Sequence, residues 1–310
     1  RVDEALEDLV QERMTKSDAP AMSLARDILL AGGKRIRPVL GLLAYEAVGG
    51  EDVDSVMDLA IAAELLHTAT LIHDDIYDQS KTRRGVPTLH STHGISHGII
   101  AGDYLFVLAF SLGGRCEERI VERMGEASAN IAAGELLQLK HIGDLGTTPE
   151  DYYAIIDGKT AGPFASACAC AAMFANAPEE VVDLLDEFGW EVGRAFQLVD
   201  DLLDLTGDSS MGKPRGTDVQ DGKMTLPLIH ALTMLHGVER EQLADVLQNF
   251  SEDRWGELTE SLEIAGSFDY ARQLIQNHID RAQKALDRLP DSEAKSLMIE
   301  IAKQSRSRRT

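Results

Sequence analysis

The stretch Asp74-Asp75-Ile76-Tyr77-Asp78 recurs in its pattern of carboxylates at Asp200-Asp201-Leu202-Leu203-Asp204, and both copies lie in apolar runs of helical character. In each of these two Asp motifs, the four-residue spacing places the first and last carboxylates one turn apart on one helix face. Carboxylates stacked in this way repel each other and weaken an isolated helix. Mg²⁺, which proteins hold with a few carboxylates and substrate phosphates, would offset the repulsion. One copy could be a solvated helix face, whereas two copies in matching contexts favour a metal site.

Helical patterns dominate the sequence around both Asp motifs, and the alternation expected of strands is nearly absent. Residues 53–78 contain no Gly or Pro, which predicts one long helix that ends in the first Asp motif. A second long helix is predicted over residues 178–205, where it carries the second Asp motif. Residues 99–112 are apolar nearly all round, as expected of a buried central helix. No linker divides the chain, so we predict an all-α fold with residues 1–310 in a single domain.

Three shorter segments interrupt the helical pattern. Residues 79–92 are polar and predict a loop after the first Asp motif. Gly and Pro within residues 158–163 are expected to break or kink the helix in which they occur. Residues 207–225 are rich in Gly, Pro and Asp and have the length of a lid or binding loop.

The charge balance argues against nucleic acid as a partner. The chain has 310 residues, of which 52 are acidic and 30 basic, and its formal net charge is −22. A surface of this sign repels a phosphate backbone. Arg outnumbers Lys by 20 to 10, and an acidic, Lys-poor surface is expected where concentrated salt screens self-repulsion. We therefore predict a halophilic source, with an ordinary acidic cytosolic protein as the alternative.

The sequence also favours a cytoplasmic protein. Its first residues are acidic rather than signal-like. The longest uncharged runs are broken by polar residues or consist mostly of Ala, so we expect no integral membrane segment. Cys116, Cys168 and Cys170 lack the spacing of a zinc site and are interpreted as small buried residues in a reducing compartment.

Basic residues gather near the Asp motifs, against the acidic background. They occur at Lys34-Arg35-x-Arg37, at Arg83-Arg84, at Lys213-x-Arg215 and at Lys223. An acidic chain that clusters cations beside metal-binding carboxylates is suited to hold an anion that also needs a metal. The pattern therefore indicates a phosphate ester as the ligand.

These elements follow one another in an order found in a known family. The order is Gly32-Gly33-Lys34-Arg35-Ile36-Arg37-Pro38, Glu64-Leu65-Leu66-His67, the first Asp motif, Arg83-Arg84-Gly85, Gly158-Lys159-Thr160, Phe196-Gln197 before the second Asp motif, and Gly222-Lys223. The chain resembles the trans-isoprenyl diphosphate synthases over this span. The resemblance implies an all-α isoprenoid synthase fold, with helices around a deep central cavity. It also implies head-to-tail condensation of isopentenyl diphosphate with an allylic diphosphate.

The implied reaction agrees with the residue types. A diphosphate leaves only when its developing charge is neutralised, which requires Mg²⁺ and cations aimed at its oxygens. Six carboxylates could hold about three Mg²⁺ ions, at roughly two oxygen ligands per ion. Ionisation leaves an allylic carbocation, which needs dry apolar walls without a nucleophile.

The resemblance implies a role for each matching residue. On or near Mg²⁺ it places Asp74, Asp75, Asp78, Asp200 and Asp204, with Asp201 as a further catalytic carboxylate. Around the allylic diphosphate it places Arg83, Thr160, Gln197, Lys213 and the catalytic Lys159 and Lys223. It implies that isopentenyl diphosphate is bound by Lys34, Arg37, His67 and Arg84.

Some of these residues have structural alternatives. His67 alone on an apolar helix would more often be a satisfied core histidine, but its place seven residues before Asp74 favours a ligand role. Thr160 could merely cap a helix. Gln197 lies three residues before Asp200 and shares its helix face, which favours a role in the site.

Rival functions explain less of the sequence. Terpene cyclases and head-to-head synthases do not account for residues 32–38, which a second diphosphate site requires. A metal phosphohydrolase built on His73 and Asp74 would leave the other histidines without a role. A catalytically silent subunit of a hetero-oligomeric prenyl synthase typically lacks one Asp motif, whereas this chain keeps both.

The helix before the first Asp motif bears on product length. Positions five, eight and eleven before Asp74 are Ala69, Leu66 and Ala63, and the resemblance places them at the cavity floor. Short-chain relatives have an aromatic residue at the first position. Ala69 leaves that level open and Leu66 is expected to form a partial floor, so we expect a geranylgeranyl or longer product. The family also implies a homodimer.

Overall fold

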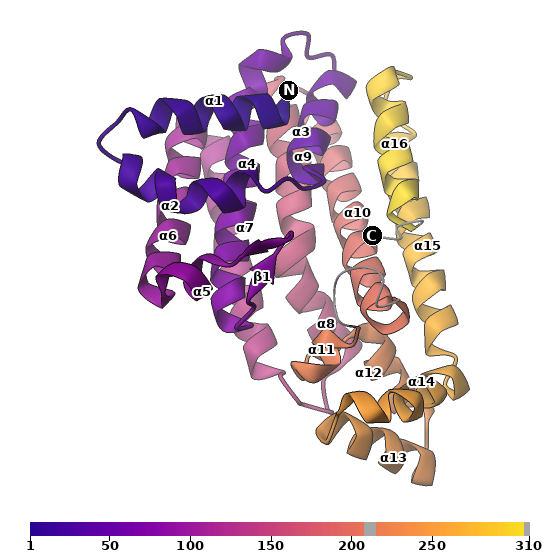
Figure 1. The fold of residues 1–310 in the computed structure, drawn as a ribbon. Helices are drawn as coiled ribbons and strands as arrows, with labels where there is room; N and C mark the ends of the chain where they lie inside the picture. Colours follow the sequence, from indigo (N-terminus) through magenta and orange to yellow (C-terminus); the bar gives the residue numbers. More distant parts are fainter. Residues whose placement is uncertain (208–214, 307–310) are drawn as a thin grey trace. The chain divides into compact units, whose positions relative to one another are not determined.

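The computed structural model describes residues 1–207 and 215–306, with side chains up to residue 304 (Figure 1). The regular secondary structure of these residues is helical apart from one short hairpin, which confirms the all-α prediction. The chain forms two compact units, each assembled from separate segments. The first unit comprises residues 1–128, 166–183 and 289–295, and the second comprises residues 129–165, 184–288 and the remainder of the chain. Lys213 lies outside the described residues.

The first unit is a stack of helices around α4. Its elements include α1 (Val2–Met14), α2 (Ala19–Leu30), α3 (Ile36–Ala47), the 3₁₀ turn η1 (Val53–Val56), α4 (Met57–Tyr77), α5 (Leu89–His93), α6 (Ile95–Gly113) and the start of α7 (Glu118–Lys140). Helix α4 packs against α1, α3 and α6, and α2 packs against α1 and α6 (Figure 1). The helix predicted over residues 53–78 is thus confirmed, with a 3₁₀ first turn.

Helix α6 is buried on one side only, so the prediction that it is buried all round is wrong for its other side. Leu105 and Ala109 are fully buried, whereas Ile99, Ile100 and Val107 are 45%, 56% and 69% exposed. The close approach of α6 to α4 depends on a missing side chain, because a Cβ on Gly102 would lie 2.2 Å from a ring nitrogen of His73. The buried side therefore faces α4, and the opposite side is an apolar surface.

A small hairpin follows α4, where the sequence predicted only a polar loop. Strand β1 (Thr82–Arg83) pairs antiparallel with β2 (Val86–Pro87). The two turn residues, Arg84 and Gly85, have φ values of 51° and 78°. A two-residue hairpin turn commonly needs positive φ at both positions, and Gly accepts it without strain. The strands are too short to show alternation in the sequence.

The second unit contains the long helix with the second Asp motif. Its elements include the end of α7, α8 (Pro149–Ile156), the π-helical turn η2 (Asp157–Ala161), the start of α9 (Gly162–Phe174) and most of α10 (Glu179–Thr206). They continue with α11 (Thr217–Gln220), α12 (Leu226–Met234), α13 (Gly237–Gln248), the 3₁₀ turn η4 (Glu252–Arg254), α14 (Trp255–Ile264), α15 (Ser267–Leu286) and most of α16 (Glu293–Arg306). The break predicted at residues 158–163 coincides with the π-helical turn, which widens the helix without ending it.

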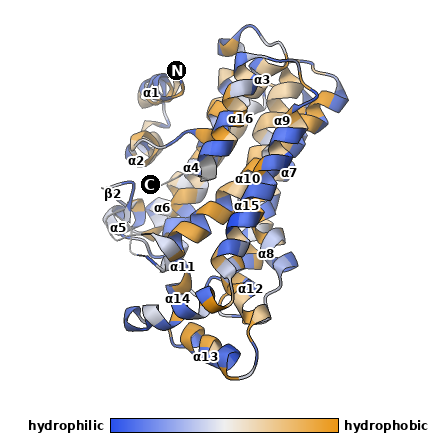
Figure 2. Cartoon of the chain, turned by 90° about the vertical axis from the view of Figure 1, so that its right-hand side faces the viewer, coloured by the Kyte–Doolittle hydropathy of each residue, from blue (hydrophilic) through white to orange (hydrophobic). Residues whose placement is uncertain are grey.

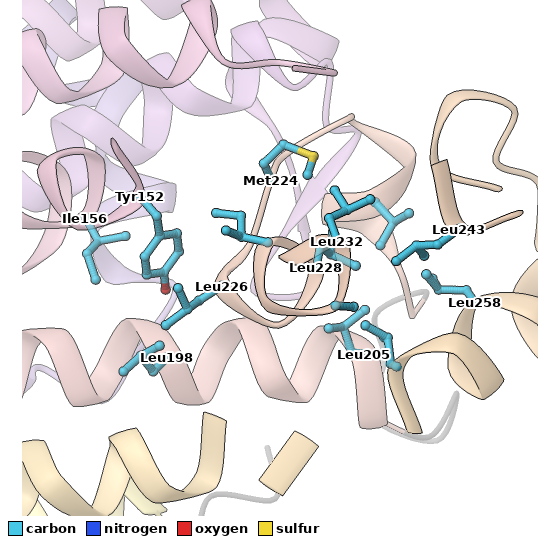
Figure 3. Packing of buried hydrophobic residues seen from close by; sticks show 14 of the residues in the cluster. Tyr152, Ile156, Leu198, Leu205, Met224, Leu226, Leu228, Leu232, Leu243 and Leu258 are labelled. Atoms are coloured by element: carbon cyan, nitrogen blue, oxygen red, sulfur yellow. The ribbon is translucent and has the colours of Figure 1, made fainter. Parts of the chain in front are cut away.

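The core of the second unit fixes the orientation of α10. Leu198 and Leu205 of α10 are buried in a cluster with Leu226 and Leu232 of α12, and Leu258 of α14 joins it (Figure 3). Burial of each such side chain contributes about 1.5–3 kcal/mol. Helices α13, α14 and α15 carry both hydrophobic and hydrophilic residues, as amphipathic helices do (Figure 2). Because Leu198 and Leu205 are buried in this core, α10 is oriented so that Asp200 lies on its exposed face.

Within the described part of the chain, two helical segments are long and apolar enough to cross a membrane. They are residues 53–77 and 95–113, and in their most apolar windows 56% and 39% of the residues are buried in the protein. Core helices of soluble proteins meet the same criterion, so length and composition do not decide between the two environments. Cys168 and Cys170 are buried as predicted, whereas Cys116 is half-buried.

Candidate active site

The first Asp motif ends α4, where the helix dipole disfavours negative charge. Asp74 is half-buried, Asp78 is exposed, and Asp75 between them is only 2% exposed. Arg83 of the hairpin donates from both Nε and Nη2 to Oδ1 of Asp75, at 2.8 and 2.6 Å. Burial raises the pKa of Asp75, and the Arg83 bonds only partly oppose this. Arg83 of the hairpin therefore serves as the counter-ion of the middle carboxylate, whereas the outer carboxylates, Asp74 and Asp78, are the candidates to bind a metal ion.

The hairpin also connects to the glycine loop before α3. Arg84 donates from Nη1 to the carbonyl oxygen of Gly32. A Cβ on Gly33 would lie 2.8 Å from Cζ of Arg84, so the guanidinium rests on a backbone that must lack a side chain. Burial, and then the charges of Arg37 and Arg84, lower the pKa of His67 well below its ordinary value. Three residues predicted to hold isopentenyl diphosphate thus lie within electrostatic reach of one another, while Lys34 is exposed.

Arg35 has a different task from the cations on either side of it. It is 5% exposed, has a φ of 47°, and donates to Glu64 Oε1 at 2.5 Å. It also donates to Asp3 Oδ1 at 2.9 Å and to the carbonyl oxygen of Leu29 at 2.8 Å. These three bonds anchor the glycine loop to α1, α2 and α4. Arg35 therefore holds in place the backbone that presents Lys34.

The second Asp motif lies within α10, and its middle carboxylate is held by neutral donors. Asp201 is 2% exposed, and its two oxygens accept from the Tyr152 hydroxyl at 2.6 Å and from Nε2 of Gln197 at 2.8 Å. Burial, and then the charge of Asp218, raise the pKa of Asp201. Asp200 of the same motif is exposed. Among the residues that the structure describes, no basic side chain is bonded to Asp201, in contrast to Asp75.

The third carboxylate of this motif meets the start of α11. Asp204 accepts backbone N–H bonds from Thr217 at 3.0 Å and from Asp218 at 3.2 Å. Burial and the nearby charge of Asp218 nevertheless raise the pKa of Asp204 to about 6. Lys223 Nζ lies 3.5 Å from Asp218 Oδ1 and 3.1 Å from Asp221 Oδ2. Hard oxygen donors crowded in this way repel one another, and a bound Mg²⁺ would offset the repulsion.

Lys159 and Thr160 lie on the π-helical turn and contact different neighbours. Lys159 Nζ forms an ion pair with Glu135 and a hydrogen bond of 3.1 Å with Oε1 of Gln138, both on α7. The Thr160 hydroxyl donates to Oε1 of Gln197 at 2.9 Å. A chain of hydrogen bonds therefore runs from Thr160 through Gln197 to Asp201.

The candidate floor residues differ in exposure. Ala69 is fully buried, whereas Ala63 and Leu66 are half-buried. A residue five positions before Asp74 is rotated by about 140° from it around a helix of 3.6 residues per turn. Ala63 and Thr70 lie within about 40° of Asp74 on the same basis, and both are half-buried. Thr70, which the sequence analysis did not select, therefore shares the face of the first Asp motif.

Several contributors to the site were missed from the sequence. They are the partners of predicted residues, namely Glu135, Gln138, Tyr152 and Asp218. Asp218 was within reach of sequence reasoning, because it lies five residues before Lys223 in the predicted binding loop. The others depend on contacts between helices that no local spacing encodes. In the described residues, no three Asp, Glu, His or Cys side chains converge as in a fully formed metal site.

Comparisons with known proteins agree with this arrangement. The family model described as polyprenyl synthetase matches residues 20–263. The octaprenyl diphosphate synthase of Escherichia coli is 38% identical over 285 residues, which cover 89% of this chain and 86% of that protein. The polyprenyl synthase of Caulobacter crescentus, solved with calcium and isoprenyl diphosphate, superposes with a TM-score of 0.92 at 34% identity, covering 99% of this chain and 95% of that one. The geranylgeranyl pyrophosphate synthetase of Pyrococcus horikoshii gives a TM-score of 0.91 at 34% identity, with the same coverage.

Proposed function

Because the chain belongs to the polyprenyl synthetase family, we propose that it is a prenyltransferase that condenses isopentenyl diphosphate head-to-tail with allylic diphosphates. The observation that carries the proposal is the pairing of two Asp motifs with two separate groups of cations. The cations Arg37 and Arg84, with the neutral His67 near them, form one group in the first unit. Lys159, with Thr160 beside it on the π-helical turn, and Lys223 belong to the second unit. Two diphosphates need two such sites, whereas a hydrolase or cyclase needs one.

Each group of residues has a definite task in this reaction. Bound Mg²⁺, held by the outer carboxylates Asp74, Asp78, Asp200 and Asp204, would neutralise the charge on the departing diphosphate. Lys159 and Lys223 add positive charge at the same diphosphate oxygens. The Thr160 hydroxyl and the Gln197 amide, which are bonded to each other, would complete the polar surroundings of the allylic diphosphate. A neutral His67 donates or accepts a hydrogen bond without adding charge to the arginines around it.

A turnover assay tests the proposal. Purified protein is supplied with labelled isopentenyl diphosphate, Mg²⁺ and, in turn, geranyl or farnesyl diphosphate, and the extracted lipid label is counted. We expect incorporation that requires both substrates and is lost in EDTA. A cyclase would consume the allylic substrate alone. No turnover with any allylic substrate would support the silent-subunit alternative.

The product is proposed to be geranylgeranyl or longer. Ala69 and Ala63 are small, and Leu66 is the bulkiest of the three candidate floor residues. Overall identity does not fix the length, because an octaprenyl and a geranylgeranyl synthase are 38% and 34% identical to this chain. Chromatography of dephosphorylated products from the turnover assay gives the answer directly.

The exposed side of α6 is proposed to pair with a second copy of the chain. Ile99, Ile100 and Val107 form an apolar surface that would be exposed to water in a monomer. A homodimer would cover this surface, and the apolar α4 and α6 would then serve as core and interface helices of a cytoplasmic protein. Replacing Val107 with Glu should convert a dimer to a monomer in sedimentation equilibrium, whereas a wild-type monomer would contradict the proposal.

The acidic surface is proposed to be an adaptation to concentrated salt. The Debye length falls from about 10 Å at 0.1 M to about 3 Å at 1 M, so repulsion among surface carboxylates weakens over this range. We predict that Tm and turnover both rise between these two KCl concentrations. Flat or falling curves would indicate an ordinary acidic cytoplasmic protein and leave the enzymatic proposal intact.

A further inference from the structure

The π-helical turn with Lys159 and Thr160 is tied to α10 at both ends. At its end, Thr160 donates to Gln197 at 2.9 Å. At its start, Asp157 accepts two parallel bonds from Arg194, from Nε to Oδ1 at 2.7 Å and from Nη2 to Oδ2 at 2.8 Å. Paired bonds of this kind fix the orientation of both planar groups, which a single bond does not. The sequence analysis singled out neither Asp157 nor Arg194.

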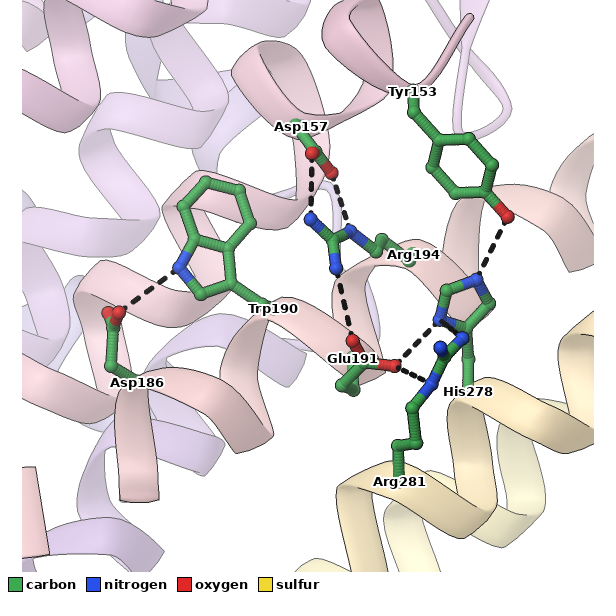
Figure 4. A network of polar contacts seen from close by, with 8 residues as sticks. All are labelled: Tyr153, Asp157, Asp186, Trp190, Glu191, Arg194, His278 and Arg281. Carbon is green, nitrogen blue, oxygen red and sulfur yellow. Dashed lines mark hydrogen bonds and ion pairs between the residues drawn. The ribbon is translucent and has the colours of Figure 1, made fainter. Parts of the chain in front are cut away.

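Arg194 is itself held by a network of polar groups (Figure 4). Its Nη1 donates to Oε1 of Glu191 at 3.0 Å. The other oxygen of Glu191 lies 2.7 Å from Nδ1 of His278 and 2.9 Å from Nε of Arg281, both on α15. The network ends on α8, because Nε2 of His278 lies 3.0 Å from the Tyr153 hydroxyl. Glu191 and His278 are both buried, so the guanidinium has little freedom to move.

The turn needs such a restraint because its backbone is closely packed. A Cβ on Gly158 would lie 2.6 Å from the carbonyl oxygen of Asn130 on α7, so the turn lies directly against that helix. A π-helical turn is an uncommon conformation that persists only where its surroundings stabilise it. The ion pair between Asp157 and Arg194 stabilises the turn on one side, and packing against α7 stabilises it on the other.

We propose that Arg194, through its paired bonds to Asp157, is a positioning residue that holds Lys159 and Thr160 in the geometry required by the allylic diphosphate. Arg194 does not touch substrate in this assignment. Its effect passes through Asp157 to residues two and three positions further along the turn. The expected effect on catalysis rests on the proposed function. The restraint of residues 157–161 by Arg194 does not depend on it.

Three variants test it, with one control. Arg194→Gln removes both bonds to Asp157. Asp157→Asn removes the negative charge with which Arg194 pairs. Arg194→Lys keeps the charge but cannot make two parallel bonds. Arg272→Gln is the control, because Arg272 forms an exposed ion pair with Asp269 on α15 at 2.7 Å.

Two measurements are made on each protein. Hydrogen–deuterium exchange over residues 157–161 reports the order of the turn and needs no activity. We expect faster exchange in Arg194→Gln and Asp157→Asn than in the wild type and the control. Steady-state kinetics should show kcat lowered by about ten- to a hundredfold, the scale of a small misplacement of catalytic groups. KM for the allylic diphosphate should rise while KM for isopentenyl diphosphate stays unchanged, and Arg194→Lys should lie between the extremes.

The outcomes separate the inference from the proposed function. An inactive wild type overturns the proposed function, and exchange over residues 157–161 then decides the positioning of the turn. Wild-type exchange in Arg194→Gln overturns the inference, whatever the activity. So does a loss of activity that affects both KM values equally, because general damage to the fold, measured in parallel by Tm, would then explain it.

Discussion

The two Asp motifs share a spacing but differ in how the protein holds their middle carboxylate. Asp75 faces a cation, because Arg83 donates to it twice. Asp201 faces neutral donors, Tyr152 and Gln197, and lies within reach of the negative charge of Asp218. The first motif is therefore partly neutralised from within, whereas the second depends more on added cations. Identical sequence patterns thus occupy unequal electrostatic environments.

The outer carboxylates Asp74 and Asp200 should contribute equally to turnover, although the middle carboxylates of the two motifs have different partners. We predict that Asp74→Ala and Asp200→Ala each lower turnover by at least about a thousandfold, the scale of losing one electrostatic stabiliser of the transition state. Substrate binding should suffer less, because the cations around each diphosphate remain. Steady-state turnover with saturating Mg²⁺ measures the effect. Near-normal turnover in either variant would mean that one motif does not bind a catalytic metal.

The α4 helix should also set product length, which α10 should not. We predict that Ala69→Phe shortens the main product towards farnesyl and, because Ala69 is fully buried, costs about 1–3 kcal/mol of stability through overpacking. Leu66→Phe, at a half-buried position, should shorten the product at a smaller cost. Chromatography of dephosphorylated products and urea unfolding measure the two effects. If both variants keep the wild-type product distribution, the floor lies elsewhere.

The middle carboxylates should respond differently to neutralisation. Asp75→Asn leaves the Arg83 guanidinium without its carboxylate, and we predict a loss of about 1–3 kcal/mol in the free energy of unfolding. Asp201→Asn can keep both contacts, because its oxygen accepts from Gln197 and the Tyr152 hydroxyl can accept from its amide. It also removes a like charge near Asp218, so we expect stability close to that of the wild type. Urea unfolding in EDTA compares the two, and equal losses would remove the proposed asymmetry.

The smallest expected effect concerns the acid stability of the network behind α10. Burial opposes ionisation of Glu191, but the bond to His278 and the charges of Arg281 and Arg194 outweigh it and lower the pKa of Glu191. A carboxyl with a depressed folded-state pKa stabilises the protein above its unfolded pKa of about 4.3, and this stability is lost as pH falls through the folded pKa. Glu191→Gln should therefore be less stable than the wild type at pH 7, with the gap narrowing below about pH 4. A gap independent of pH would show that Glu191 acts through shape alone.

Local patterns in the sequence were sufficient for much of this protein. The long helices that carry Asp74 and Asp200 are present where the absence of Gly and Pro, or the Pro at position 178, predicted them. These features act within a few turns of one helix, so sequence spacing encodes them. The family follows in the same way, because its motifs are short and ordered along the chain. The roles of the individual site residues remain predictions.

Only the tertiary structure decided which partners those residues have. Arg83 and Arg84 are adjacent in the sequence, yet one bonds Asp75 and the other bonds Gly32, because a hairpin turn separates their directions. Asp75 and Asp201 hold the same place in the same motif, yet one meets a guanidinium and the other a phenol. Residues far apart in sequence meet through helix packing, which depends on the whole core rather than on any local pattern. The sequence alone therefore determined the helices and the order of the family's motifs, while packing determined charge balance, burial and the restraint of each site residue.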